Sequence, residues 1–123
     1  MTASSARPWP RELRYRRADR ILEIDFDTGE HVALPAELLR VESPSAEVQG
    51  HGTAHKVIVS GKRQVGINAI DPVGNYAVRI HFDDGHASGL YSWDYLHELG
   101  RNQDRLWADY LTALAQRNLS REP

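Results

Sequence analysis

The densest group of side chains able to do chemistry surrounds an Asp-Asp-Gly stretch at residues 83–85. Asp84-Gly85 is a signal for a two-residue hairpin turn between two strands. The resulting register predicts polar side chains on one face of the hairpin, beside the turn residue Asp84: Arg79, His81, Asp83, His86 and Ser88. Imidazoles, carboxylates and a hydroxyl gathered in one place would suit a metal ion, an anion or a partner protein.

The same face has a simpler interpretation, because antiparallel sheets commonly expose one face to water. A Ser/His/Asp catalytic site is not indicated, since no nucleophile elbow is present and nothing in the pattern suggests an oxyanion hole. In the predicted register Phe82 lies opposite Ala87. The other face of the hairpin is therefore expected to be core, formed by Tyr76, Val78, Ile80, Phe82 and Tyr91.

Two further sets of residues have both a structural and a functional interpretation. Tyr91, Trp93, Tyr95 and Trp107 are most simply core and helix-packing aromatics, but an exposed patch with Tyr91 and Trp93 would suit a protein partner. His51 and His55 lie in a Gly-rich loop over residues 49–55 and could close over His86 as a metal clip. Two loop histidines fall short of the four ligands of a structural zinc site, so incidental histidines are the alternative.

Composition excludes several classes of protein. The 123 residues fit a single domain, and the net charge of -2 provides no basic footprint for nucleic acid. The absence of cysteine excludes disulfides, thiolate zinc sites, iron–sulfur ligation by this chain and Cys nucleophiles. No apolar run reaches membrane-spanning length, and the N-terminus lacks the apolar core of a secretory signal. We expect a cytoplasmic protein without a cofactor.

Hydrophobic periodicity predicts hairpins followed by helices. Residues 13–18 could be an edge strand, residues 20–26 and 30–34 alternate around an Asp-Thr-Gly turn, and residues 76–83 alternate again. Short helical segments are expected at residues 36–41 and 43–48, the second capped by Ser43, with β-branched runs at 56–60 and 64–70 and a turn at 71–75. Ser92 is expected to cap a helix that stops at Gly100, and a last helix is predicted at 104–118.

These elements predict an α+β fold, an antiparallel β-sheet of hairpins with the C-terminal helices packed on one face. Residues 1–12 are expected to be a flexible leader, residues 13–118 a single domain and residues 119–123 a tail.

The stretch Asp-Gly-His-Ala-Ser-Gly-Leu-Tyr-Ser-Trp-Asp-Tyr-Leu at residues 84–96 resembles the signature of the gamma-butyrobetaine hydroxylase-like N-terminal domain family, a domain of unknown function. Residues 34–41, 43–52 and 73–78 resemble that family too, so the resemblance spans about residues 14–111. It implies a stand-alone bacterial member of a family whose domain also precedes an oxygenase domain and follows a P-loop iron–sulfur carrier. The catalytic residues belong to the oxygenase domain, so the resemblance implies a fold and an accessory role rather than a reaction.

The resemblance also bears on metal binding. In the hydroxylases this domain holds zinc through three cysteines and a histidine. Their Cys-Pro-Cys-x-x-Cys segment corresponds here to Ser43-Pro44-Ser45-Ala46-Glu47-Val48, and only the histidine is matched, at His86. One imidazole does not make a closed zinc site, so no structural zinc is expected.

Three functions remain open from the sequence. The first is a non-catalytic accessory or protein-interaction module, serving an oxygenase or an iron–sulfur assembly partner, and this is the one we favour. The second is a metal- or small-ligand-binding protein that uses His86, His81 and Asp83. The third is a small enzyme, which would require a deep pocket around His86.

Overall fold

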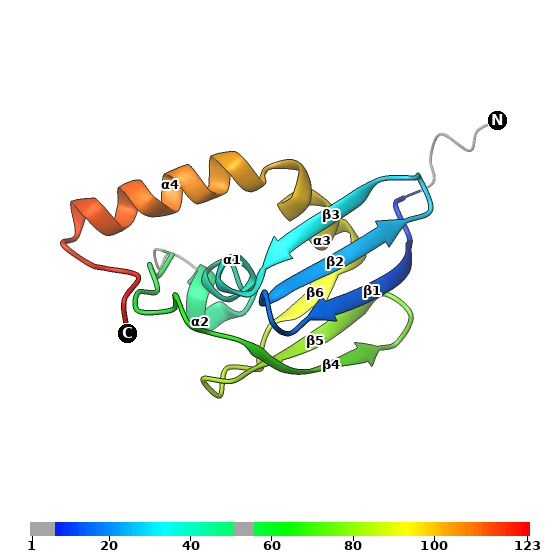
Figure 1. Ribbon diagram of the computed structural model, residues 1–123, viewed down its shortest axis with the longest axis horizontal. Coiled ribbons are helices and arrows are strands. Elements are labelled where there is room, and N and C mark those ends of the chain that lie inside the picture. Colours follow the sequence, from blue (N-terminus) through cyan, green and yellow to red (C-terminus); the bar gives the residue numbers. More distant parts are fainter. Residues whose placement is uncertain (1–6, 51–55) are drawn as a thin grey trace.

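The computed structural model describes residues 7–50 and 56–123, so His51 and His55 lie outside the described residues. Within these ranges the chain forms two three-stranded antiparallel sheets and four helices (Figure 1). The C-terminal helices pack against the sheets, and the predicted α+β class is confirmed. The hairpins expected to share one sheet are divided between two.

The first sheet follows the alternation of the sequence. Strands β1 (Pro10–Arg16), β2 (Ile21–Phe26) and β3 (His31–Pro35) pair in that order. One face of β2 is buried: Leu22, Ile24 and Phe26. The other face carries carboxylates that pair with arginines of β1, and Arg14 alone contacts both Glu23, at 3.2 Å, and Asp25, at 3.0 Å. Because β1 begins at Pro10, part of the expected leader belongs to the sheet.

The second sheet contains β4 (Ile67–Val73), β5 (Ala77–Phe82) and β6 (Leu90–Ser92). β4 continues through Asp71 and Pro72, so the turn expected at 71–75 is shorter and later than predicted. The expected core position of Tyr76 is wrong: its side chain is 55% exposed. Tyr76 is the last residue of the turn, and the strand that would have turned it inward begins only at Ala77.

Residues of helices α1 (Ala36–Val41) and α3 (Trp93–Arg101) complete the hydrophobic core formed with the two sheets. Helix α1 follows β3, and the short α2 (Ala46–Gln49) has Ser45 rather than the expected Ser43 as its N-cap residue. Helix α3 is capped as predicted, because the Ser92 hydroxyl accepts the Tyr95 N–H at 3.1 Å. It runs through Gly100, which lies against Val32 of β3 instead of ending the helix.

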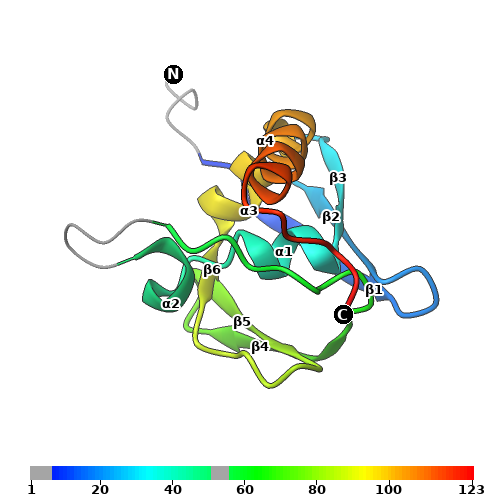
Figure 2. The same ribbon diagram turned by 90° about the vertical axis from the view of Figure 1, so that its left-hand side faces the viewer.

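Helix α4 (Gln103–Gln116) lies beyond α1, and the C-terminal segment runs back across α1 (Figures 1 and 2). Its Tyr110 and Leu114 form a second small cluster with Val41, against which Ile58 and Val59 pack. The β-branched run at 56–60 is therefore an extended packing segment and not a strand. No helix in the described part of the chain is long and apolar enough to span a membrane.

Candidate functional site

The tip of the β5–β6 hairpin differs from the predicted register by one residue. The Phe82 N–H donates to the His86 carbonyl at 3.0 Å, which leaves a three-residue loop, 83–85, with Gly85 at φ +92°. Further along, Val78 pairs with Tyr91 and Arg79 with Leu90, as expected. A one-residue slip moves side chains to the opposite face, so His86 lies on the Phe82 side.

The expected shared face of His81, Asp83 and His86 is therefore wrong. His81 Nε2 lies 2.8 Å from Asp71 Oδ2, across the β4–β5 pair. Asp83 is exposed and donates its N–H to the Gly66 carbonyl at 2.9 Å. The structure thus separates the three side chains of the ligand-binding hypothesis, and it brings together no group of three or more metal-ligating side chains within residues 7–50 and 56–123.

His86 instead enters a polar cluster with the loop that precedes α2. Its side chain is 7% exposed, and Nε2 lies 2.9 Å from Ser43 Oγ and 3.3 Å from Ser45 Oγ. Its ring is 6.1 Å from that of Phe82. The motif correspondence of Ser43 and Ser45 with zinc-binding cysteines was the one sequence signal for this contact, since the residues are about forty positions apart.

Asp84 anchors the loop through two cations. Its Oδ2 lies 2.7 Å from both Arg40 Nε and Lys62 Nζ, and its Oδ1 accepts the His86 N–H at 3.0 Å. Partial burial alone would raise the pKa of Asp84, but hydrogen bonds from Lys62, the His86 amide and Arg40 outweigh it and lower the pKa to about 2. Asp84 therefore holds the hairpin tip against α1, a role for Arg40 and Lys62 that the sequence did not indicate.

The residues that correspond to the family's zinc ligands do not fit zinc. Two neutral hydroxyls and the alkyl side chain of Val48 replace the three thiolates, and zinc in proteins is bound by sulfur, imidazole nitrogen and carboxylate. The hydroxyls of Ser43 and Ser45 contact each other and His86 at hydrogen-bond distance. This set of hydroxyl and imidazole groups holds two chain segments together through hydrogen bonds, at the place where the family resemblance implies a metal in the hydroxylases.

The cluster also has the order of a Ser-His-Glu triad, but its nucleophile is inaccessible. His86 Nδ1 lies 3.8 Å from Glu47 Oε1, and the Glu47 carboxylate accepts a hydrogen bond from Ser88. Ser43 has no exposed surface. A substrate carbonyl must reach the nucleophilic oxygen within about 3–3.5 Å, so the arrangement seen here supports a structural role for Ser43.

We expect acid to destabilise the wild-type chain more than a His86→Gln variant. Burial, followed by the charge of Arg40, holds the pKa of His86 below its ordinary value of 6.5, against the opposing charges of Glu47 and Asp84. Below that pH the unfolded chain binds a proton that the folded chain resists, so the free energy of unfolding falls as pH falls. Urea unfolding should show that the free energy of unfolding of the wild type approaches that of the variant as the pH falls from about 7.5 to about 5. Parallel pH profiles would contradict this assignment.

The aromatic residues of the candidate site divide between core and surface. Tyr91 is fully buried, its hydroxyl donates to the Leu39 carbonyl at 2.5 Å, and burial raises its pKa. Trp93 is half-buried against the core, and its indole N–H donates to the Asn75 carbonyl at 2.9 Å. Trp9 packs edge-on against it, with ring centroids 6.2 Å apart.

These rings border a groove that the sequence did not indicate. The groove has a volume of about 320 Å³ and is lined by Arg7, Pro8, Trp9, Asn75, Tyr76, Ser92, Trp93 and Asp94. Trp9 is 48% exposed and Tyr76 is 55% exposed. Arg7 and Asp94 form an ion pair of 3.0 Å at its rim. We call Trp9, Tyr76 and Trp93 with this space the aromatic groove.

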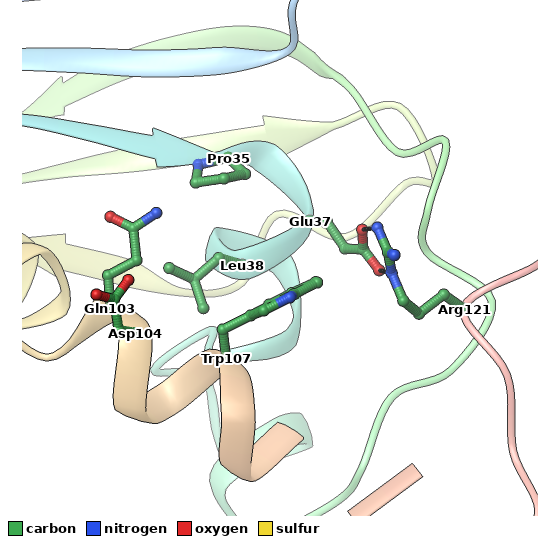
Figure 3. Close-up of a pocket in the computed structure, with 7 residues that line it drawn as sticks. All are labelled: Pro35, Glu37, Leu38, Gln103, Asp104, Trp107 and Arg121. Atoms are coloured by element: carbon green, nitrogen blue, oxygen red, sulfur yellow. Dashed lines mark hydrogen bonds and ion pairs between the residues drawn. The ribbon is translucent and has the colours of Figure 1, made fainter. Parts of the chain in front are cut away.

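A second cavity of about 320 Å³ lies between α1 and α4 (Figure 3). It is lined by Pro35, Glu37, Leu38, Gln103, Asp104, Trp107 and Arg121. Glu37 is buried and faces Arg121, which comes from the segment after α4 (Figure 3).

Solved structures resemble the chain closely. Two NMR solution structures share 47% and 54% sequence identity with it, cover 96% and 100% of it with 93% and 92% of their own chains, and superpose with TM-scores of 0.84 and 0.83. A crystal structure from Acidithiobacillus ferrooxidans, described as a protein of unknown function in the DUF971 family, shares 40% identity, with 74% of this chain and 91% of that chain covered and a TM-score of 0.63.

No curated protein matches the chain. The family model described as gamma-butyrobetaine hydroxylase-like, N-terminal, matches residues 13–97, which is most of the two sheets, helices α1 and α2, and the start of α3. The chain therefore belongs to the gamma-butyrobetaine hydroxylase-like N-terminal domain family, whose function is unknown.

Proposed function

We propose that this protein is a non-catalytic accessory module that binds an extended, proline-containing segment of a partner protein in the aromatic groove. The observation that carries the proposal is the exposure of Trp9 and Tyr76 beside Trp93 on one surface. Tryptophan and tyrosine are enriched at the centres of protein interfaces, because they supply large contact areas at low entropic cost.

The chemistry of the groove favours stacking over hydrogen bonding. The indole N–H of Trp93 is already bonded to the Asn75 carbonyl, so the ring presents mainly its apolar surface to a ligand. The rings of Trp9 and Trp93 meet at 66°, which leaves ring faces and edges pointing in different directions. Aromatic-lined grooves of this kind take polyproline II segments, whose ordering entropy is already low.

The family context suggests where to look for the partner. Fusion to an oxygenase domain and to a P-loop iron–sulfur carrier makes components of those systems the first candidates, as the sequence resemblance implied. The buried position of Ser43 and the separation of His81 from His86 give the enzyme and metal-binding hypotheses no comparable support.

Tyr76→Ala is expected to weaken binding of a proline-rich peptide by about 2 kcal/mol, roughly thirtyfold in Kd. Tyr76 lies in a turn and is exposed, so its truncation should leave the fold intact. The measurement is an NMR titration of the labelled protein with a decaproline peptide, following the indole signals of Trp9 and Trp93.

Leu111→Ala is the matched control, because Leu111 is 41% exposed but lies on α4, outside the groove. It should bind the peptide like the wild type. The proposal fails if saturating peptide leaves the Trp9 and Trp93 signals in place, or if both variants lose affinity equally.

A further inference from the structure

The segment after α4 folds back and lies beside residues 61–63 (Figure 2). The Gly61 N–H donates to the Ser120 carbonyl and the Arg63 N–H donates to the Arg121 carbonyl, each at 2.9 Å. Arg63 also forms a 2.5 Å ion pair with Glu122. We call residues 119–122 the C-terminal latch.

The latch places Arg121 in a site built from the rest of the fold. Arg121 Nε lies 2.9 Å from Glu37 Oε2 and its Nη2 lies 2.7 Å from Oε1, a bidentate pair (Figure 3). Its guanidinium carbon is 5.0 Å from the centre of the Trp107 ring. The Glu37 side chain is only 7% exposed, so this carboxylate needs a cationic partner to remain favourable. Glu37 and Trp107 thus match a guanidinium in charge, fork geometry and ring stacking.

The space beside this pair gives a second side chain access to it. The cavity between α1 and α4 borders Glu37, Trp107 and Arg121, with Leu38 on its wall (Figure 3). An incoming arginine would reach Glu37 through this cavity, which Arg121 also lines. Replacement would then keep the buried carboxylate paired.

The latch is held by polar contacts and has few buried apolar ones. None of residues 119–123, all of which are described, belongs to either hydrophobic cluster, and Leu119 is 40% exposed. The Arg63–Glu122 pair lies on the surface, where ion pairs contribute little. Segments with few buried apolar contacts open at low free-energy cost.

We propose that Glu37 and Trp107 form an arginine-binding site which Arg121 occupies in the free protein, and which an arginine-bearing extended segment of a partner protein fills when the latch opens. The partner's carbonyl groups would accept the N–H groups of Gly61 and Arg63, as those of Ser120 and Arg121 do here. This arginine site shares no residue with the aromatic groove, which includes Ser92, Trp93 and Asp94 at the start of α3.

The test is a fluorescence-anisotropy titration with a labelled peptide of residues 118–123, Asn-Leu-Ser-Arg-Glu-Pro, which contains the latch. The full-length Arg121→Gln variant should bind it at least about tenfold more tightly than the wild type, because its site is not already filled. Adding Glu37→Gln to that variant should abolish binding, and so should glutamine in place of arginine in the peptide. Equal affinity of wild type and Arg121→Gln, or indifference to Glu37→Gln, would overturn the proposal.

A second measurement covers the case in which Arg121→Gln does not fold. In the wild type, saturating unlabelled peptide should move the Nε–H NMR signal of Arg121 to the position of a solvent-exposed arginine. An unmoved signal at saturation would count against exchange. If sedimentation instead shows that the wild type alone forms dimers through exchanged latches, a second copy of the chain is the occupant and the proposed partner class is wrong.

Discussion

Replacing Ser43, Ser45 and Val48 together with cysteine is expected to give a protein that binds one zinc ion tightly. The His86 imidazole and the hydroxyls of Ser43 and Ser45 already converge, with Nε2 at 2.9 Å and 3.3 Å from the two oxygens. In a tetrahedral site with Zn–S of about 2.3 Å and Zn–N of about 2.0 Å, sulfur and nitrogen ligands lie about 3.5 Å apart, so only small shifts are needed. Val48 is 2% exposed and stands at the third thiolate position of the corresponding motif.

The expected effect is large, because structural zinc sites contribute about 10–16 kcal/mol of apparent binding free energy at neutral pH. Metal analysis after dialysis should find stoichiometric zinc, and the melting temperature should fall when a chelator is added. The triple variant with His86→Ala is the control and should hold zinc much more weakly. Substoichiometric zinc in the triple variant would show that the cluster does not have the geometry of the metal site.

Gly100→Ala is expected to destabilise the fold by about 1–3 kcal/mol, although glycine to alanine in a helix normally stabilises by about 1 kcal/mol. A Cβ at Gly100 would lie 2.4 Å from Val32 Cγ1 and 2.9 Å from Val32 Cβ. Val32 is β-branched and held in β3, so it has little freedom to turn away. The cost of this steric clash therefore exceeds the gain in helix propensity, so the substitution lowers the free energy of unfolding instead of raising it.

A double-mutant cycle with Val32→Ala separates the two terms. The double variant should regain part of the stability that Gly100→Ala loses, with a coupling energy of about 1 kcal/mol or more from urea unfolding. If the effects of the two substitutions on the free energy of unfolding were additive, the alanine at position 100 would not clash with Val32. A Gly100→Ala variant more stable than the wild type would show that helix propensity dominates.

The sequence predicted those features that depend on local chemistry. Leu22, Ile24 and Phe26 alternate with charged residues, so the strand and its buried face followed directly. Ser92 was identified as a helix cap because a hydroxyl at that position satisfies a free N–H group. Family membership was also recognisable, since the stretch at 84–96 resembles the family's signature.

The candidate site was harder to predict, because it depends on one residue of register. Asp84-Gly85 suggests a two-residue turn, but the structure has a three-residue loop at 83–85. In this loop Asp84 forms ion pairs with Arg40 and Lys62, which are distant from it in the chain. That change turned His86 toward Ser43 and away from His81. Long-range ion pairs leave no periodic signal in a sequence, and neither does the groove that Trp9 makes with Trp93.

The ion pairs between arginines of β1 and carboxylates of β2 also affect whether copies of the molecule associate with one another. β1 is an edge strand, and a row of free backbone groups at an edge can template pairing with another chain. Charged side chains along β1 and the irregular register between Pro10 and Glu12 make that edge a poor template. The charged side chains of β1 therefore protect this edge of the first sheet from pairing with another chain.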